Sequence, residues 1–396
     1  MSSRTDTGGG KSAVISGLGV VSAAGGNVPE TLRNFAAVRR LPGPVSLFTT
    51  PLDPPVFEVK QPLPGNGASR TLQLALQAIR EALAGARLGG DLSGRRVGVC
   101  LGTTVACQLN DLEFYTAFRR NGVAPLEPVR RFLKGNLAEA AAAEIRATGP
   151  HITTVNACSS GSDAIGVALS WLRAGLCDLA IAGGADELNR VPFCGFASLS
   201  VMSRQPCAPY DRDRQGLNLG EGAGVLILET PESAAARGVA ADLVLAGYGA
   251  ACDAHHLTAP RPDGTGLEAA IRASLEEAGV TAADVAFVNA HGTATRDNDK
   301  VEGAVLARVF GPGIGVLSTK GYTGHTLGAA GGLEAAFTAL ALREGWLPAS
   351  AGFANRDDEI PLGALRERTP VRGRWGVSTS LAFGGNNASL VIGCNR

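Results

Sequence analysis

The sequence lacks three features that would place it in other protein classes. Its 36 basic and 36 acidic side chains give a formal net charge of +0, so no overall field attracts nucleic acid or an anionic membrane. No run of about eighteen apolar residues occurs, which argues against a transmembrane helix. Residues 1–11 carry no apolar segment of the signal-peptide kind, and we expect them to form a flexible tail.

The eight cysteines also lack a recognisable pattern. None forms a C-x-x-C pair or has the spacing of a metal site, so we expect no metal, and reduced thiols in a cytoplasmic protein. With 396 residues and 45% hydrophobic content, the chain can bury a large core in one big domain or two fused halves. The 53 glycines, with pairs at Gly183-Gly184 and Gly331-Gly332, indicate tight turns and close backbone approaches.

Strand-like and helix-like segments alternate along the chain, which predicts an α/β fold with buried sheets. We expect strands at 13–21, 96–101, 151–155, 179–182, 224–228, 285–289, 315–318, 376–381 and 388–392, and helices at 162–176, 232–237 and 333–342. A boundary near residue 242 would divide the chain into halves 12–241 and 242–396. No internal repeat is visible in the sequence.

One cysteine lies in a position suited to chemistry. Cys158, in the stretch Asn156-Ala157-Cys158-Ser159-Ser160-Gly161, separates the strand at 151–155 from the helix at 162–176. Unpaired N–H groups and the positive end of the dipole at a helix N-terminus favour a thiolate and can hold a developing oxyanion. The alternative is a buried structural thiol, the usual fate of a cysteine.

Two histidines follow predicted strands in the second half of the sequence. His291 follows the strand at 285–289, at the carboxyl end where α/β folds place their sites. His325 lies near the start of the helix at 333–342, whose dipole disfavours a proton on the ring and so predicts a neutral imidazole. Each could instead be a structural histidine, although their glycine-flanked junctions favour a site.

A glycine-rich turn follows the strand at 376–381. Phe383-Gly384-Gly385-Asn386-Asn387 connects it to the last predicted strand. A plain hairpin turn explains the glycines, and a mobile active-site loop is the alternative.

Together these motifs resemble the signature set of elongating β-ketoacyl-[acyl carrier protein] synthases of the synthase I/II type. The resemblance covers roughly Ala13 to Gly393 and rests on the Cys158 stretch, HGTATRDND from His291, STKGYTGHTLGAAG from Ser318 and AFGGNNAS from Ala382. It implies a thiolase-type fold, in which two similar βα halves stack as five αβαβα layers. It also implies a homodimer.

The resemblance further implies a Cys-His-His site. Cys158 would accept the acyl group, with its own N–H and that of Phe383 forming the oxyanion hole, and both histidines would hold the malonyl thioester carbonyl. The resemblance implies electrostatic support by Lys320, Glu334, Asp299 and Glu302, of which Asp299 and Glu302 would organise water and the lysine. It implies that Thr293 and Thr295 contact the phosphopantetheine arm. It also implies a gating loop of Phe383, Gly384 and Gly385 and a carrier contact at Arg204.

The implied reaction is a decarboxylative condensation in fatty-acid type elongation. An acyl group on Cys158 would join malonyl carrier protein to give a 3-oxoacyl carrier protein, with no cofactor beyond the carrier's phosphopantetheine. Acyl carrier proteins are acidic, so a basic patch should mark the docking face. Arg70, Arg130 and Arg131 are weaker candidates for it, and the basic segment 129–136 could equally be a solvated turn.

Three other functions compete with this interpretation. A catalytically silent chain-length partner would lack Cys158, and a thiolase or initiating synthase would lack the second histidine motif at His325. A type II ketosynthase of a specialised polyene or polyketide pathway, working with a partner subunit, would keep every catalytic residue. The family usually has glycine and threonine where this chain has Ala382 and Asn386, so its loop motion or acyl preference could differ.

Overall fold

The computed structural model describes residues 12–63, 68–106, 111–134, 136–240 and 242–395. The expected tail at 1–11 and Cys107 lie outside these ranges. Ten strands hydrogen-bond in the order β3-β2-β4-β5-β1-β6-β12-β11-β7-β8. The strands are β1 (Ala13–Ser22), β2 (Val97–Gly102), β3 (His151–Thr154), β4 (Leu179–Asp186), β5 (Gly222–Glu229), β6 (Leu243–Cys252), β7 (Val285–Asn289), β8 (Gly315–Leu317), β11 (Trp375–Ala382) and β12 (Asn386–Cys394), with a separate pair β9 (Trp346–Leu347) and β10 (Thr369–Pro370).

Helices connect most of these strands. They are α1 (Val28–Ala36), α2 (Arg70–Gly85), α3 (Leu112–Asn121), α4 (Glu127–Lys134), α5 (Leu137–Glu144), α6 (Ser160–Arg173), α7 (Arg190–Ser198), α8 (Pro231–Ala236), α9 (Thr265–Ala278), α10 (Arg296–Phe310), α11 (Lys320–Thr323) and α12 (Ala330–Glu344), with short 3₁₀ turns at Ala282–Asp284 and Leu327–Ala329. None of the described helices is long and apolar enough to cross a membrane.

The sheet consists of two halves with the same topology. In the first half, β1 to β5, the order is β3-β2-β4-β5-β1, and in the second half, β6 to β12, it is β8-β7-β11-β12-β6. In each half three neighbouring strands are parallel and the other two pair antiparallel. The repeat that the sequence conceals is therefore evident in the fold. The boundary at residue 242 stays a prediction.

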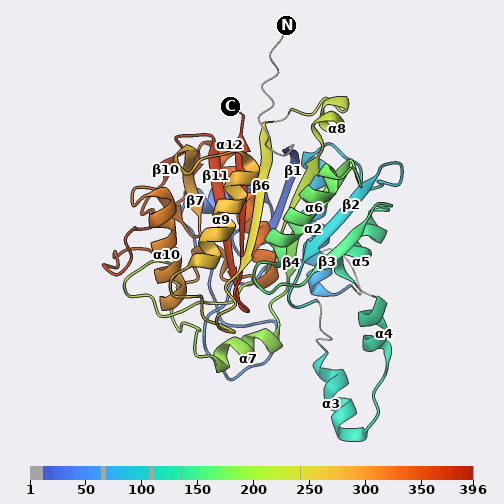
Figure 1. Ribbon diagram of the computed structural model, residues 1–396. Helices are drawn as coiled ribbons and strands as arrows, with labels where there is room; N and C mark the ends of the chain where they lie inside the picture. The colour runs from blue at the N-terminus through green and yellow to red at the C-terminus, as the bar shows by residue number, and fades with distance from the viewer. Residues whose placement is uncertain (1–11, 64–67, 107–110, 135, 241, 396) are drawn as a thin grey trace.

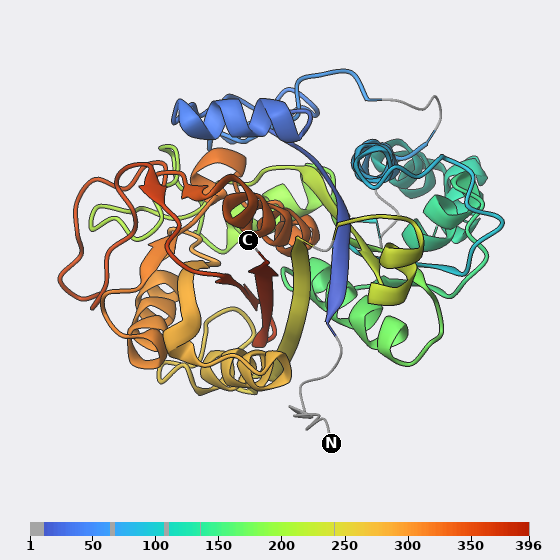
Figure 2. The same cartoon turned by 90° about the horizontal axis from the view of Figure 1, so that it is seen from above.

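Five layers follow from how the helices cover this sheet. Apolar residues of α2 and α5 pack on one face of the first half, and those of α9 and α10 pack on one face of the second. Helices α6 and α12 lie between the two halves, and their apolar residues join strands of both in one central core (Figures 1 and 2). The predicted αβαβα architecture is confirmed.

The central helix α12 packs very closely on its neighbours. Every residue from Ala330 to Leu342 is buried, as expected of a helix that is apolar on all sides. A Cβ atom added at Gly332 would lie only 2.4 Å from the carbonyl oxygen of Gly224 on β5. Glycine at this position lets the helix backbone approach the sheet, which accounts for part of the glycine excess.

The functional segments all follow the carboxyl ends of strands, as the sequence predicts. Cys158 follows β3, His291 follows β7, Lys320 and His325 follow β8, and Phe383 follows β11. The predicted helix at 162–176 begins two residues earlier, at Ser160, and ends at Arg173.

Helices α3 and α4 project from the body of the molecule (Figure 1). The basic segment that we considered as a solvated turn lies largely in α4, because its residues continue a helix from Glu127. Both helices and their connection expose apolar side chains: Leu112, Tyr115, Phe118, Val123, Leu126 and Leu133. The edge strand β3 also exposes Ile152.

Candidate active site

A strained turn between β3 and α6 presents Cys158. Ala157 has a positive φ of 48°, a backbone conformation that non-glycine residues seldom adopt and that often marks functional sites. The Ser160 hydroxyl stabilises the turn, since it accepts from the Asn156 N–H at 2.8 Å and donates to the Ala157 carbonyl at 2.6 Å. Cys158 itself is 4% exposed.

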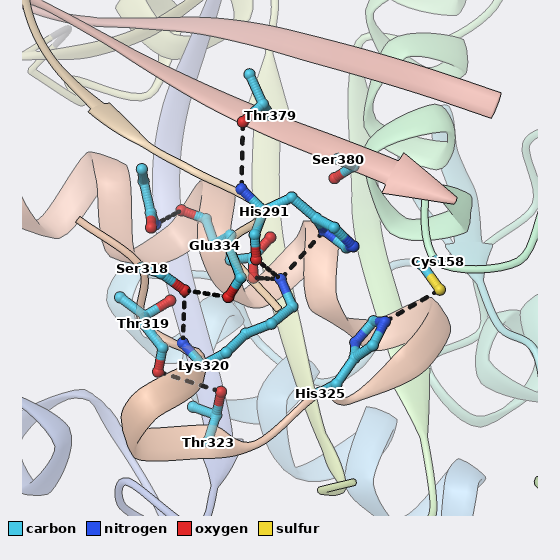
Figure 3. Close-up of polar contacts among 12 residues, drawn as sticks. Cys158, His291, Ser318, Thr319, Lys320, Thr323, His325, Glu334, Thr379 and Ser380 are labelled. Carbon is cyan, nitrogen blue, oxygen red and sulfur yellow. Dashed lines mark hydrogen bonds and ion pairs between the residues drawn. The ribbon is translucent and has the colours of Figure 1, made fainter. Parts of the chain in front are cut away.

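His325 lies beside this thiol. Its Nε2 is 3.1 Å from the Cys158 sulfur (Figure 3). The residue belongs to the turn between α11 and the 3₁₀ segment at 327–329, five positions before α12 begins. His325 therefore lies shortly before this helix, as expected, and the helix begins three residues earlier than the predicted start at residue 333.

Lys320 connects the second histidine to a buried carboxylate. Its Nζ lies 3.1 Å from His291 Nδ1, donates to the His291 carbonyl at 2.5 Å, and forms an ion pair with Glu334 on α12 (Figure 3). Lysine and glutamate side chains here are 1% and 3% exposed. The paired charges compensate one another where neither can be solvated.

Both histidines are neutral at physiological pH. Burial lowers the pKa of each ring well below its usual value, and the positive charge of Lys320 lowers both further. Because an ammonium group can only donate, His291 Nδ1 accepts from Lys320 and we assign its proton to Nε2. The rings meet nearly edge to face, with centroids 5.2 Å apart, so two neutral imidazoles lie together near the thiol.

The protonation state of Cys158 differs from the sequence-based expectation. Burial raises the pKa of its thiol to about 12, and the charge of Lys320 and the N–H of Phe383 only partly oppose this increase. Desolvation therefore outweighs the helix terminus that was expected to favour a thiolate. The resting group is a thiol that must lose its proton during reaction.

The rate of Cys158 alkylation should consequently rise with pH. Below a pKa of about 12, the thiolate fraction increases about tenfold for each pH unit. We expect iodoacetamide labelling of the Cys158 peptide to accelerate in this way between about pH 6 and pH 9, measured by peptide mass spectrometry, with exposed Cys194 as an internal reference for the reagent. A plateau within that window would contradict the raised pKa.

Glu302 and Asp299 support the His291 loop through its backbone. Glu302 accepts from the N–H groups of His291 and Gly292, both at 2.8 Å, and from the Tyr210 hydroxyl at 2.9 Å. Asp299 accepts from the N–H of Tyr210 at 2.7 Å, and burial raises its pKa to about 6. Among the described residues these two carboxylates accept from backbone N–H groups, whereas the carboxylate that pairs with Lys320 is Glu334. Their direct contacts therefore hold the loop and not the lysine.

A cavity of about 410 Å³ opens onto these groups. Cys158, His291 and His325 line this cavity, as do Thr293 and Thr295, whose hydroxyl oxygens are 2.9 Å apart. The cavity can admit a substrate that carries a thioester, with the thioester carbonyl close to the thiol and both imidazoles.

The turn after β11 forms one side of this cavity. It is the turn of a β-hairpin, since Ala382 pairs with Asn386, so the predicted hairpin turn is confirmed, whereas the mobility of this segment stays a prediction. Gly384 and Gly385 have φ values of 88° and 80°, which favour glycine. The Phe383 ring stacks on Phe196 of α7, with centroids 5.3 Å apart.

The four arginines considered for carrier binding lie in different environments. Arg204 is exposed and its nearest carboxylate, Asp53, is 3.7 Å away. Arg70 donates to Glu221 at 2.6 and 2.7 Å, so its charge is already paired within the protein, and its contact with a carrier stays a prediction. Arg130 is exposed on α4, and the Arg131 side chain lies outside the described part of the structure.

Two residues of the site were not predicted from the sequence. Asp186 at the end of β4 accepts from the Thr103 hydroxyl at 2.6 Å and from the Gly328 N–H at 2.6 Å, and burial raises its pKa to about 7. It ties the His325 loop to the first half. The position of Asp186 at the carboxyl end of a strand could have identified it as a site residue from the sequence. Phe196, which lines the cavity, had no such sequence signal.

Comparisons with known proteins agree with this geometry. Residues 50–234 match the family described as Beta-ketoacyl synthase, N-terminal domain, and residues 243–354 match Beta-ketoacyl synthase, C-terminal domain. The 3-oxoacyl-[acyl-carrier-protein] synthase 2 of Staphylococcus aureus (strain N315) is 31% identical over 405 aligned residues, covering 96% of this chain and 98% of the relative.

Solved structures give the same result. The ishigamide ketosynthase/chain length factor superposes with a TM-score of 0.90 at 32% identity, covering 98% of this chain and 100% of that one. AntDE:AntF, a type II PKS acyl-carrier protein in complex with its ketosynthase bound to the hexaketide, gives 0.89 at 26% identity, with coverage of 98% and 100%.

Proposed function

Because the chain belongs to the β-ketoacyl synthase family and is an acyltransferase of the ketosynthase type, we propose that Cys158 carries the acyl group in a decarboxylative condensation with malonyl carrier protein. The observation that carries this assignment is the convergence of Cys158, His325 and the Lys320-bound His291 at one cavity. These groups supply a nucleophile and two neutral hydrogen-bond donors. No further cofactor is needed for the chemistry proposed.

The first half-reaction transfers the acyl group to sulfur. Cys158 attacks the thioester carbonyl of the acyl carrier, and the oxyanion is held by the N–H groups of Cys158 and Phe383. His325 Nε2, 3.1 Å from the sulfur, stabilises its developing negative charge. The carbon–sulfur bond to the carrier then breaks, and the proton lost by Cys158 ends on the departing carrier thiol.

The second half-reaction forms the new carbon–carbon bond. His291 and His325 donate from Nε2 to the malonyl thioester oxygen, so the carboxylate can leave as carbon dioxide and its bonding electrons form an enolate. The enolate carbon attacks the acyl carbonyl on Cys158. The carbon–sulfur bond to the enzyme breaks, releasing the 3-oxoacyl carrier and the Cys158 thiolate, which takes up a proton from water.

Intact-protein mass spectrometry tests this cycle. Wild-type protein mixed with a panel of acyl carrier thioesters should gain one acyl mass, and adding malonyl carrier should remove it as a 3-oxoacyl product. Product without any acyl-enzyme, or acyl-enzyme that malonyl carrier does not discharge, would overturn the proposal.

The same experiment separates two pathways. We propose fatty-acid type elongation, in line with the 3-oxoacyl synthase relatives. A specialised polyene or polyketide ketosynthase is the second candidate, favoured by the close superposition on a ketosynthase/chain length factor. Preference for saturated acyl carriers supports the first, and preference for unsaturated or 3-oxo carriers supports the second. The cytoplasmic location stays a prediction.

An acyl carrier protein is the proposed macromolecular substrate. The AntDE:AntF structure contains such a carrier bound to a ketosynthase. Arg204 is the best placed cation of the candidates, because its side chain is exposed and follows α7, whose Phe196 lines the cavity. An acidic carrier helix would compete with Asp53 for this guanidinium.

We further propose that a second copy of the chain covers β3 and the projecting helices α3 and α4. The edge strand presents unpaired backbone groups, and these helices expose large apolar side chains, features that mark a protein interface. A chain length factor of the kind named in the ishigamide structure is the alternative partner.

Sedimentation velocity distinguishes these partners. We expect wild-type protein at micromolar concentration to be a dimer, and Phe118→Glu on α3 to be a monomer because it places a charge in the apolar contact. Leu176→Glu, which alters a side chain as exposed as Phe118 beyond the far end of α6, should remain dimeric. A monomeric wild type would refute the homodimer and favour the partner subunit.

A further inference from the structure

The proposed oxyanion hole draws its two donors from different halves of the fold. One is the N–H of Cys158, after β3 of the first half, and the other is the N–H of Phe383, after β11 of the second half. The Phe383 N–H already donates toward the Cys158 sulfur. The separation of the two donors therefore depends on how the halves are held together at this point.

The strand pairing between the halves lies far from the site, and the backbone bridge of Leu219 with His325, which does join the halves at the site, includes neither of the two donor segments. Strands β1 and β6 pair only at Ala13 with Leu245 and at Val14 with Val244. The site lies near the other end of β6, where Cys252 pairs with Asn386. The seven steps of extended strand from Leu245 to Cys252 span about 23 Å, so this pairing gives little local control.

Two side-chain hydrogen bonds join the halves at the start of α6 itself. The hydroxyl oxygens of Ser162 and Ser380 lie 2.9 Å apart, and the Tyr248 hydroxyl donates to Asp163 Oδ1 at 2.8 Å. Ser162 is four positions after Cys158, and Ser380 is three positions before Phe383. The serine pair therefore bridges the two donor segments directly.

Asp163 extends the second bond to the nucleophile turn. Its Oδ2 accepts from the Asn156 side-chain N–H at 2.7 Å and from the Ser159 hydroxyl at 2.8 Å. These two residues flank Ala157 and Cys158. One carboxylate thus holds both sides of the strained turn while it binds a tyrosine from the other half.

Tyr248 is well fixed for this purpose. A Cβ atom added at Gly166 of α6 would lie 2.4 Å from the Tyr248 ring, so the ring packs directly on the helix backbone. Burial and the charge of Asp163 raise the pKa of the phenol, which keeps the hydroxyl protonated and able to donate.

We propose that the Tyr248–Asp163 and Ser162–Ser380 hydrogen bonds are positioning contacts that set the distance between the two oxyanion donors. This inference rests on the proposed acylation of Cys158. None of the four side chains reacts with substrate. Their effect is on the carbonyl oxygen of the thioester, which needs both donors in place, and a misplacement of reacting groups by 1 Å can lower a rate about a hundredfold.

Two reactions of the same sulfur provide the test. Acylation by octanoyl-N-acetylcysteamine develops an oxyanion, whereas alkylation by iodoacetamide does not. For the double variant Tyr248→Phe/Ser380→Ala we expect kcat for acylation to fall about tenfold, with KM, the alkylation rate and the melting temperature close to those of wild type. Ser380→Thr in place of Ser380→Ala keeps the hydroxyl, so it should restore the part of kcat for acylation that depends on the Ser162–Ser380 hydrogen bond.

The matched control is a second buried serine pair. Ser274 and Ser389 have hydroxyl oxygens 2.8 Å apart, but both belong to the second half, on α9 and β12. Ser389→Ala should leave acylation within about twofold of wild type. Unchanged acylation in the double variant, or equal loss of acylation and alkylation, would overturn the proposal. Absence of acylation in the wild type would instead refute the proposed function.

Discussion

Replacing Cys158 with alanine should abolish acyl transfer and condensation, by at least about 10⁴-fold in kcat. The thiol is the only sulfur among the described residues that lines the cavity with both histidines, so no neighbouring group can accept the acyl chain. Intact-protein mass spectrometry with acyl carrier thioesters should show no added acyl mass. The fold should persist, because alanine fits the space of the thiol.

Cys100→Ala is the matched control for this substitution. Cys100 is also buried, but it lies within β2 and packs in the central core. The control should retain acylation and tolerate a small loss of stability from the missing sulfur. Full elongation by Cys158→Ala, or loss of acylation in both variants, would refute the assigned nucleophile.

The two histidine substitutions should separate the half-reactions. Each donor lost from an oxyanion site typically lowers the rate by about 10²–10³, so His291→Ala and His325→Ala should both reduce carbon dioxide release from malonyl carrier by this factor. Acyl transfer should differ between them. His325 lies 3.1 Å from the sulfur, whereas His291 is held by Lys320, so only His325→Ala should also slow acylation.

Two measurements check this separation. Labelled carbon dioxide released from malonyl carrier reports decarboxylation, and the acyl mass on Cys158 reports transfer. Gln in place of either histidine retains a side-chain donor, and it should recover part of the decarboxylation that alanine removes. Undiminished carbon dioxide release from both alanine variants would contradict the assigned roles, as would normal acylation by His325→Ala.

The sequence was sufficient to predict the strands that carry the site. A short β-branched or apolar segment precedes each of Cys158, His291 and Phe383, and a glycine follows within a few residues. That local pattern places the three residues at strand ends. The five-layer arrangement followed from family resemblance. The duplicated topology did not show in the sequence, because each half repeats strand order and burial while the side chains differ.

Local sequence patterns could not predict the contacts between segments that are distant along the chain. The thiol pKa was misjudged because burial of Cys158 depends on α12, on the His325 loop and on the turn at Phe383, all far away along the chain. Arg70 had the charge of a carrier contact, but its carboxylate partner Glu221 lies 151 residues later. The conformation of residues 129–134 was also missed, since helix α4 has little core contact to reveal it.

The repeated topology has a consequence for how the site is composed. Equivalent strands of the two halves end around one site with different residues: β3 leads to Cys158 and β8 to His325, β2 leads to Thr103 and β7 to His291, and β4 leads to Asp186 and β11 to Phe383. Cys158, His325, His291 and Phe383 line the cavity, whereas Asp186 accepts from Thr103 and from the Gly328 N–H of the His325 loop. The two members of each matching pair are chemically different, and the groups assigned to the reaction come from both halves. The catalyst is therefore a property of the junction between two copies of one architectural unit, and neither copy would be an enzyme by itself.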